Sequence, residues 1–114
     1  MKRASGRRDE VLAALDDLVD TLQESQKVGQ QAQRRAKAIK RQREKGLGYA
    51  DIVPAEEKPL IVELMRDNLT RMIDAGSRLQ RVQARALYDE GLTMDQIGKL
   101  FGVTRQRVSM LLRD

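Results

Sequence analysis

The sequence predicts an all-α protein, with a long N-terminal helical hairpin of coiled-coil-like character followed by a C-terminal helix-turn-helix. Of the 114 residues, 40% are apolar but only 3% are aromatic, so the core must consist of Leu, Ile, Val, Met and Ala, which favours helices over sheets. Apolar residues recur at spacings of three and four along two long stretches, and no segment alternates as a strand does. We therefore expect a basic disordered tail (1–8), a long-helix oligomerisation region (9–76, with a linker at about 46–58) and a helix-turn-helix domain (77–114).

The first long helix is expected from about Asp9 to Lys45, a stretch without Pro and with Gly29 as its one glycine. Acidic residues near its start and basic residues near its end suit the helix dipole. Its apolar stripe, close to a heptad seam, comprises Val11, Leu15, Leu18 and Leu22 and continues with Ala32, Ala36 and Ile39. The run Gly46-Leu47-Gly48 should end this helix.

The linker and the second long helix follow. Pro54 and Pro59 predict non-helical backbone just upstream of each. The second helix should begin near Pro59, and its apolar face includes Ile61, Met65, Leu69 and Met72, followed by Leu79, Val82 and Ala86. The stretch 60–90 forms either one helix or two broken at Gly76; the apolar phase survives the glycine, which favours one.

The charge along the first helix reverses sign. Residues 9–26 carry six acidic and no basic side chains, and residues 27–45 carry eight basic and one acidic. Two long helices and a small terminal domain cannot cover all their apolar stripes in a compact monomer, so we expect a homodimer through the N-terminal helices. Antiparallel packing would match acid with base. The alternative is that the first helix folds back on the second, and the oligomeric state and orientation stay open.

Punctuating residues define the C-terminal motif. Gly91 closes the preceding helix, Thr93 caps a short helix over Met94–Phe101, Gly102 makes the turn, and Thr104 caps the last helix. Gly98 is small where the two short helices should cross. The expected core of the motif is Ile97, Phe101, Val103, Val108 and Leu111, closed by Leu87, Leu92 and Leu112.

The outward side chains of the last helix are Arg105, Gln106, Arg107, Ser109 and Met110. Arg pairs bidentately with guanine and Gln with adenine, so this first turn suits the edges of bases in a major groove. The helix N-terminus and Thr104 can meet a phosphate.

The C-terminal motif resembles the helix-turn-helix of region 4 of the sigma-70 family and of the small bacterial regulators that share it. The residues that carry the resemblance are Ile97-Gly98-Lys99 and the stretch from Phe101 to Val108. The resemblance covers about residues 78–113. It implies that the helix starting at Thr104 enters the major groove. No sigma region 2 is recognisable upstream and no wing follows the last helix, so we do not expect a complete sigma factor. The resemblance makes Thr104, Arg105, Gln106, Arg107 and Ser109 contact candidates, with Lys99 and Arg113 for the DNA backbone.

These features predict a sequence-specific DNA-binding transcriptional regulator whose N-terminal helices dimerise. One alternative is an adaptor that binds RNA polymerase or a sigma-associated protein through the acidic helix 9–26. Another is a nucleoid-type architectural protein, to which the net charge of +5 and the basic run 27–45 are suited. The basic run fits a solvated face equally well. The operator, the sign of regulation and any effector stay open.

The residue types absent from the sequence narrow the function further. It contains no Cys and no His, which excludes thiol chemistry, Cys/His zinc sites and His bases. A phosphate-binding Gly loop and a convergent carboxylate set are also missing, so we expect no enzyme, no cofactor and no metal site. No apolar run approaches the ~20 residues of a membrane span. A cytoplasmic, nucleoid-associated location is the corresponding expectation.

Overall fold

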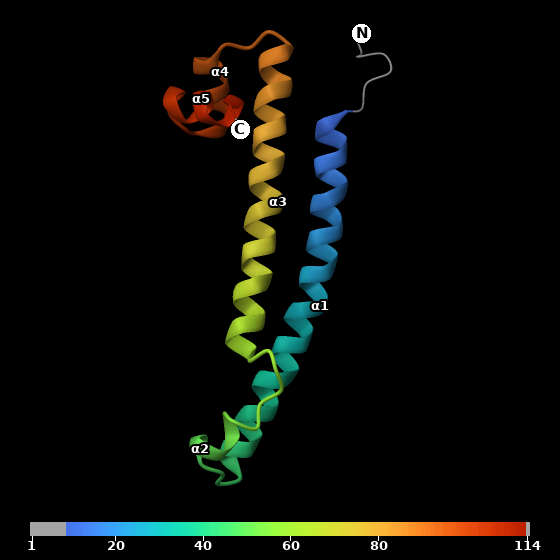
Figure 1. The fold of residues 1–114 in the computed structure, drawn as a ribbon, viewed down its shortest axis with the longest axis vertical. Helices are drawn as coiled ribbons and strands as arrows, with labels where there is room; N and C mark the ends of the chain where they lie inside the picture. The colour runs from blue at the N-terminus through green and yellow to red at the C-terminus, as the bar shows by residue number, and fades with distance from the viewer. Residues whose placement is uncertain (1–8, 114) are drawn as a thin grey trace. The chain divides into compact units, whose positions relative to one another are not determined.

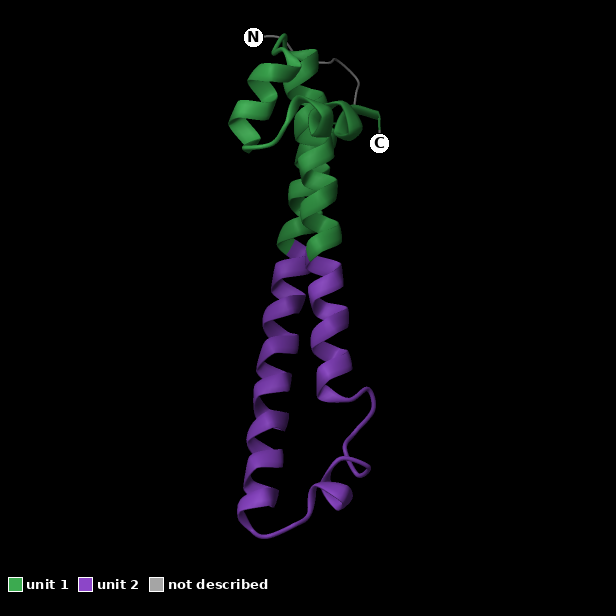
Figure 2. Cartoon of the chain, turned by 90° about the vertical axis from the view of Figure 1, so that its left-hand side faces the viewer, with its two compact units in different colours: residues 1–19, 73–114 green, residues 20–72 purple. Residues whose placement is uncertain are grey.

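The computed structural model describes residues 9–113, which belong to two compact units (Figure 2). Unit 1 combines residues up to 19 with those from 73 onward, and unit 2 is formed by residues 20–72. The basic tail expected at 1–8 lies outside the described residues. Within 9–113 there are no strands, which confirms the all-α prediction. The helices are α1 (Glu10–Glu44), α2 (Tyr49–Ile52), α3 (Ile61–Asp89), α4 (Met94–Phe101) and α5 (Arg105–Arg113) (Figure 1).

Helix α1 begins and ends close to the predicted residues. The carboxylate of Asp9 accepts the backbone N–H groups of Val11 and Leu12 at 3.0 and 3.2 Å, so it caps the first turn. The helix continues without a break through Gly29. It ends at Glu44, and two residues later Gly46 has a left-handed φ of 98° and donates its N–H to the carbonyl of Arg43 at 2.9 Å.

In unit 2, α1 packs antiparallel against the first part of α3 along a mixed seam. Val28 and Ala32 of α1 are buried there. Between the helices, the Asn68 amide donates to the Ser25 hydroxyl at 3.0 Å, and that hydroxyl donates to the Met72 sulfur at 3.2 Å. This polar contact within an apolar seam fixes the register of the two helices, because a shifted register would leave the amide without its partner.

The expected stripe of α1 packs within the chain only in part, because Ala32 is buried and Val11, Leu18 and Ile39 are half-buried. Leu15 is 37% exposed and Leu22 44% exposed, and Ala36 is also exposed. In unit 2 the seam runs through residues 25, 28, 32 and 35. Of these, only Ala32 belongs to the expected stripe, and two others are the polar Ser25 and Arg35. Both polar side chains have hydrogen-bond partners, so they can lie in the seam. A pattern based on apolar residues alone does not include them.

The linker corrects the prediction of non-helical backbone before Pro54. Residues 49–52 form the short helix α2, and Val53 directly before the proline has φ −65° and ψ −47°, which is right-handed helical geometry. Burial explains the turn, because Ile52 is only 3% exposed. Its N–H donates to the Gly48 carbonyl at 3.0 Å, and the guanidinium of Arg43 stacks on the ring of Tyr49 at 4.2 Å.

Arg35 ties the remainder of the linker to α1. Its Nη2 atom donates to the backbone carbonyls of Glu57 and Pro59 at 2.6 and 2.9 Å and pairs with the Glu56 carboxylate at 3.2 Å. The same carboxylate oxygen accepts the N–H of Ile61 at 2.6 Å. The two charged side chains are only 14% and 9% exposed. This network positions the residue at which α3 begins.

Helix α3 is continuous across Gly76, as the persistence of the apolar phase predicts. In unit 1, Arg78 forms an ion pair with Asp17 of α1, and Ala84 is completely buried. Among the described residues, none of the helices combines the length and the apolar character that a membrane crossing requires.

Candidate nucleic-acid interface

The helix-turn-helix begins where α3 ends at a left-handed glycine, Gly91, with φ 108°. Thr93 then caps α4 as predicted, because its hydroxyl accepts the N–H of Gln96 at 3.1 Å. The Gln96 side chain accepts the N–H of Thr93 at 2.8 Å in return. This reciprocal pair is a capping box, and the sequence carried its signal in Gln at the third position after Thr. It fixes the entry of the chain into α4.

The turn between α4 and α5 has the predicted glycine and the predicted capping residue. Gly102 is left-handed at φ 70° and ψ 33°, and the N–H of Val103 donates to the Gly98 carbonyl at 2.9 Å. The Thr104 hydroxyl accepts the N–H of Arg107 at 3.1 Å and so caps α5. These local bonds set the direction in which α5 leaves the turn.

The core of this domain closely matches the expected set. Ile97 and Val108 are fully buried and Leu111 is 2% exposed. Ala84 of α3 is also fully buried in this cluster. It is not among the residues expected in the core, because an alanine gives only a weak hydrophobic signal. The partly buried members packed around it are Leu87, Leu92, Met94, Phe101, Val103 and Leu112.

Gly98 lies where α4 packs closely against the turn and against α5. A Cβ atom added to it would lie 2.8 Å from the backbone carbonyl oxygen of Val103 and 3.6 Å from Cγ2 of Val108. The first distance is shorter than a carbon–oxygen contact allows, so only glycine fits without a shift of backbone. The prediction that Gly98 is small at a close crossing is confirmed.

Arg85 holds the end of α5 to α3. Its Nη2 donates to the backbone carbonyl of Leu112 at 2.7 Å, and its Nη1 lies 3.9 Å from a carboxylate oxygen of Asp89. This bond satisfies a carbonyl in the last turn of a helix, where no helical N–H is available. The residue pattern gives no signal for this role of Arg85, because its partner is a main-chain atom 27 residues away.

The first turn of α5 carries the predicted contact residues on its open surface. Thr104, Arg105, Gln106 and Arg107 are all exposed, whereas Ser109 is half-buried. Among residues 9–113, neither arginine of this turn forms an ion pair. Their guanidinium groups are therefore available to an external acceptor.

A shallow groove between α4 and α5 collects part of the predicted set. Lys99 of α4 lies along it with Thr104 and Arg105, and the carboxylate-bearing Asp95 also lines it. Arg113 is exposed at the other end of α5 and does not line the groove. The structure thus brings three of the seven candidates together around one opening.

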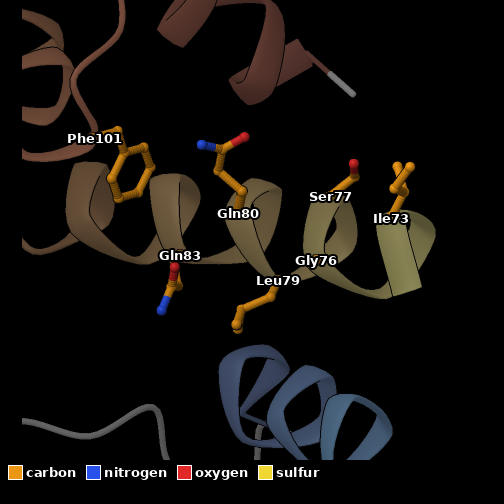
Figure 3. Close-up of a pocket in the computed structure, with 7 residues that line it drawn as sticks. All are labelled: Ile73, Gly76, Ser77, Leu79, Gln80, Gln83 and Phe101. Atoms are coloured by element: carbon orange, nitrogen blue, oxygen red, sulfur yellow. The ribbon is translucent and has the colours of Figure 1, made fainter. Parts of the chain in front are cut away.

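A second hollow lies beside the motif and is mostly uncharged. Figure 3 shows Phe101 of α4 above α3, with Gln80 and Ser77 pointing to the same side of that helix and Leu79 pointing to the other. Gly76 contributes no side chain to this wall. No charged residue lines this hollow, in contrast to the groove between α4 and α5.

This geometry defines a DNA-binding helix-turn-helix: a rigid trihelical core presents the N-terminal turn of its last helix with exposed Arg, Gln and Arg. The family model Sigma-70, region 4 matches residues 80–114, which confirms the resemblance for this C-terminal segment. That family consists of DNA-binding domains and not of enzymes. No curated protein matches the chain, and no solved structure does.

Proposed function

We propose that the protein is a sequence-specific DNA-binding transcriptional regulator that inserts α5 into the major groove and dimerises through its N-terminal helices. The observation that carries this proposal is the first turn of α5, in which Arg105, Gln106 and Arg107 are exposed on a helix fixed by a fully buried core. A rigid helix with planar hydrogen-bonding side chains at its N-terminus is the form of reader that the major groove admits.

The individual roles follow from position and chemistry. Arg105 and Gln106 read base edges, because each offers two hydrogen-bonding groups in a plane. Lys99 and Thr104, which line the groove between α4 and α5, contact phosphates and set the register on the duplex. Because Ser109 is half-buried, it contacts only those DNA atoms that lie directly against α5 in the major groove.

Arg107 and Arg113 complete the set. Arg107 shares the first turn of α5, and Arg113 is exposed in the last turn. The charge of Arg113 contributes mainly to phosphate binding, which weakens with salt and carries no sequence information.

Dimerisation supplies the specificity that one small domain lacks. A single reading helix covers a short half-site, and two copies bound to a two-fold related site combine their contacts. The spacing of the half-sites then measures the distance between the two reading helices in the dimer.

Two other functions are supported by specific features. The six acidic residues between 9 and 26 favour an adaptor that binds RNA polymerase or an associated protein. The eight basic residues between 27 and 45 favour an architectural protein that coats DNA. Neither feature uses the exposed turn of α5, so we rank both below the regulator.

Selection of bound duplexes from a random-sequence library, with the purified full chain at near-physiological salt, tests the proposal. We expect enrichment of a two-fold symmetric motif. Binding without enrichment would favour the architectural function, and absence of binding would favour the adaptor; either result overturns the regulator.

The substitution Arg105→Ala then tests the reading residue. It should weaken binding to the selected site by about 1–3 kcal/mol, or roughly 5- to 150-fold, and relax the base preference at one position. The matched control is Arg71→Ala, which removes an exposed arginine of α3 in unit 2. An equal loss of affinity on all sequences would show that Arg105 contacts only phosphate.

A further inference from the structure

Unit 2 has an open apolar groove between α1 and α3. Its α3 wall presents Val62, Met65 and Leu69, which are 59%, 55% and 53% exposed, and its α1 wall includes Gly29 and Ala36. Three large apolar side chains at spacings of three and four thus remain more than half open. A contiguous exposed patch of this kind marks an interaction surface.

The apolar surface extends along α1. Leu12, Leu15, Val19 and Leu22 recur at spacings of three and four and are 60%, 37%, 52% and 44% exposed. The same helical phase continues to Gly29, seven residues after Leu22. This open stripe is distinct from the seam that packs against α3, so α1 has two apolar faces, and residues 9–113 cover one of them.

Gly29 gives an independent indication. A glycine in a helix interior costs about 0.5–1 kcal/mol relative to alanine. Packing within the described part of the chain does not require it, because a Cβ at this position would meet nothing within 4 Å. Absence of a side chain on the wall of an open apolar groove allows the backbone of another helix to approach closely.

Charge complementarity identifies the occupant. We propose that the groove and the open stripe of α1 are covered by the same face of a second copy, in antiparallel orientation. Acidic residues 9–26 of each copy then lie beside basic residues 27–45 of the other. A parallel pair would instead place the eight basic side chains beside eight others, which is repulsive.

The charged positions flank the apolar stripe in both halves of α1. Asp16 and Asp20 follow Leu12 at spacings of four, so they lie on the face adjoining the stripe, and both are exposed. In the other half, Lys40 follows Ala36 at the same spacing of four and is also exposed. The pattern is self-complementary under a two-fold axis, as an isologous dimer requires.

This inference rests on the proposed function, because it names the surface and orientation of the dimer that the regulator uses. The first experiment measures the mass of the full chain without DNA by sedimentation equilibrium. The variant is Gly29→Glu, at a position where an added Cβ meets nothing within 4 Å in one chain. The matched control is Gln31→Glu, which adds the same charge at another exposed position of α1.

We expect the wild type and Gln31→Glu to be dimers and Gly29→Glu to be at least tenfold weaker in association, with unchanged helical circular dichroism. The orientation is measured separately with single-cysteine variants, because the sequence has no cysteine of its own. A short bismaleimide should link Leu15→Cys to Ala36→Cys in a mixture of the two, and should not link Leu15→Cys to itself.

The inference is overturned by a wild type that is monomeric at tens of micromolar, by a Gly29→Glu protein that remains a dimer, or by efficient linking of Leu15→Cys to itself. The two proposals fail separately. A dimer that binds no DNA contradicts the regulator but leaves the surface assigned here. A monomer that selects a single half-site contradicts the surface but leaves DNA reading by α5 in place.

Discussion

At Gly98, packing decides whether a substitution by alanine raises or lowers the free energy of unfolding. Glycine to alanine in a helix interior ordinarily stabilises a protein by about 1 kcal/mol, because alanine loses less backbone entropy on folding. Gly98 is buried in α4, and a Cβ there would lie 2.8 Å from the Val103 carbonyl oxygen. That oxygen belongs to the backbone of the turn, so it cannot move without displacing α5.

The magnitude follows from these two opposed terms. Overpacking a close contact costs about 1–3 kcal/mol, and the gain in helix propensity offsets about 1 kcal/mol of it. We therefore expect Gly98→Ala to lower the free energy of unfolding of unit 1 by about 1 kcal/mol. Gly76→Ala is the matched control in the same unit, because a Cβ at Gly76 meets nothing within 4 Å. It should raise the free energy of unfolding by about 0.5–1 kcal/mol.

Urea denaturation followed by circular dichroism measures both variants, and thermal unfolding gives a second reading. A difference of about 1 kcal/mol corresponds to roughly 4–8 °C in Tm for a domain of 60–100 residues. The two variants should shift in opposite directions from the wild type. A Gly98→Ala protein as stable as Gly76→Ala would refute the close crossing of α4 and α5.

Two further substitutions test the linker and the cap. Arg35→Ala removes three hydrogen bonds from a charged donor that is only 14% exposed, so it should destabilise unit 2 by about 2–4 kcal/mol and speed proteolysis within the linker, whereas the exposed neighbour Arg34→Ala should do neither. Thr93→Ala removes the capping box of α4 and should cost about 1 kcal/mol in urea unfolding, and a protein of unchanged stability would show that Gln96 alone suffices.

The helix-turn-helix was predictable because its determinants are local. Gly91 and Gly102 adopt left-handed backbone and Thr93 and Thr104 accept N–H groups three residues ahead, so each acts within its own turn. The core followed from spacing alone for Ile97 and its large apolar neighbours. What the sequence could not reveal was the bond from Arg85 to the Leu112 carbonyl, because a main-chain acceptor leaves no mark in the residue pattern.

The packing of α1 was harder to predict, because its sequence contains two apolar faces. Leu12, Leu15, Val19 and Leu22 form the more hydrophobic stripe, yet α1 turns the smaller Ala14, Val28 and Ala32 inward. Small side chains let two helices approach closely, and Ser25 completes the seam through its bond with Asn68. Choosing between the faces requires knowing the partner helix, which is specified by residues more than 40 positions away.

The open stripe of α1 also affects how the protein would achieve specificity for a DNA sequence. The first turn of α5 is held in place by Gly98 and the buried core, so the helix-turn-helix needs no second copy to keep this turn rigid. One turn with Arg105, Gln106 and Arg107 contacts few base pairs, and each mismatch costs only about 1–3 kcal/mol. Discrimination against a genome of competing sites thus requires a second reading turn. The larger leucine and valine side chains remaining outside the seam of α1 are suited to bringing that turn from another copy.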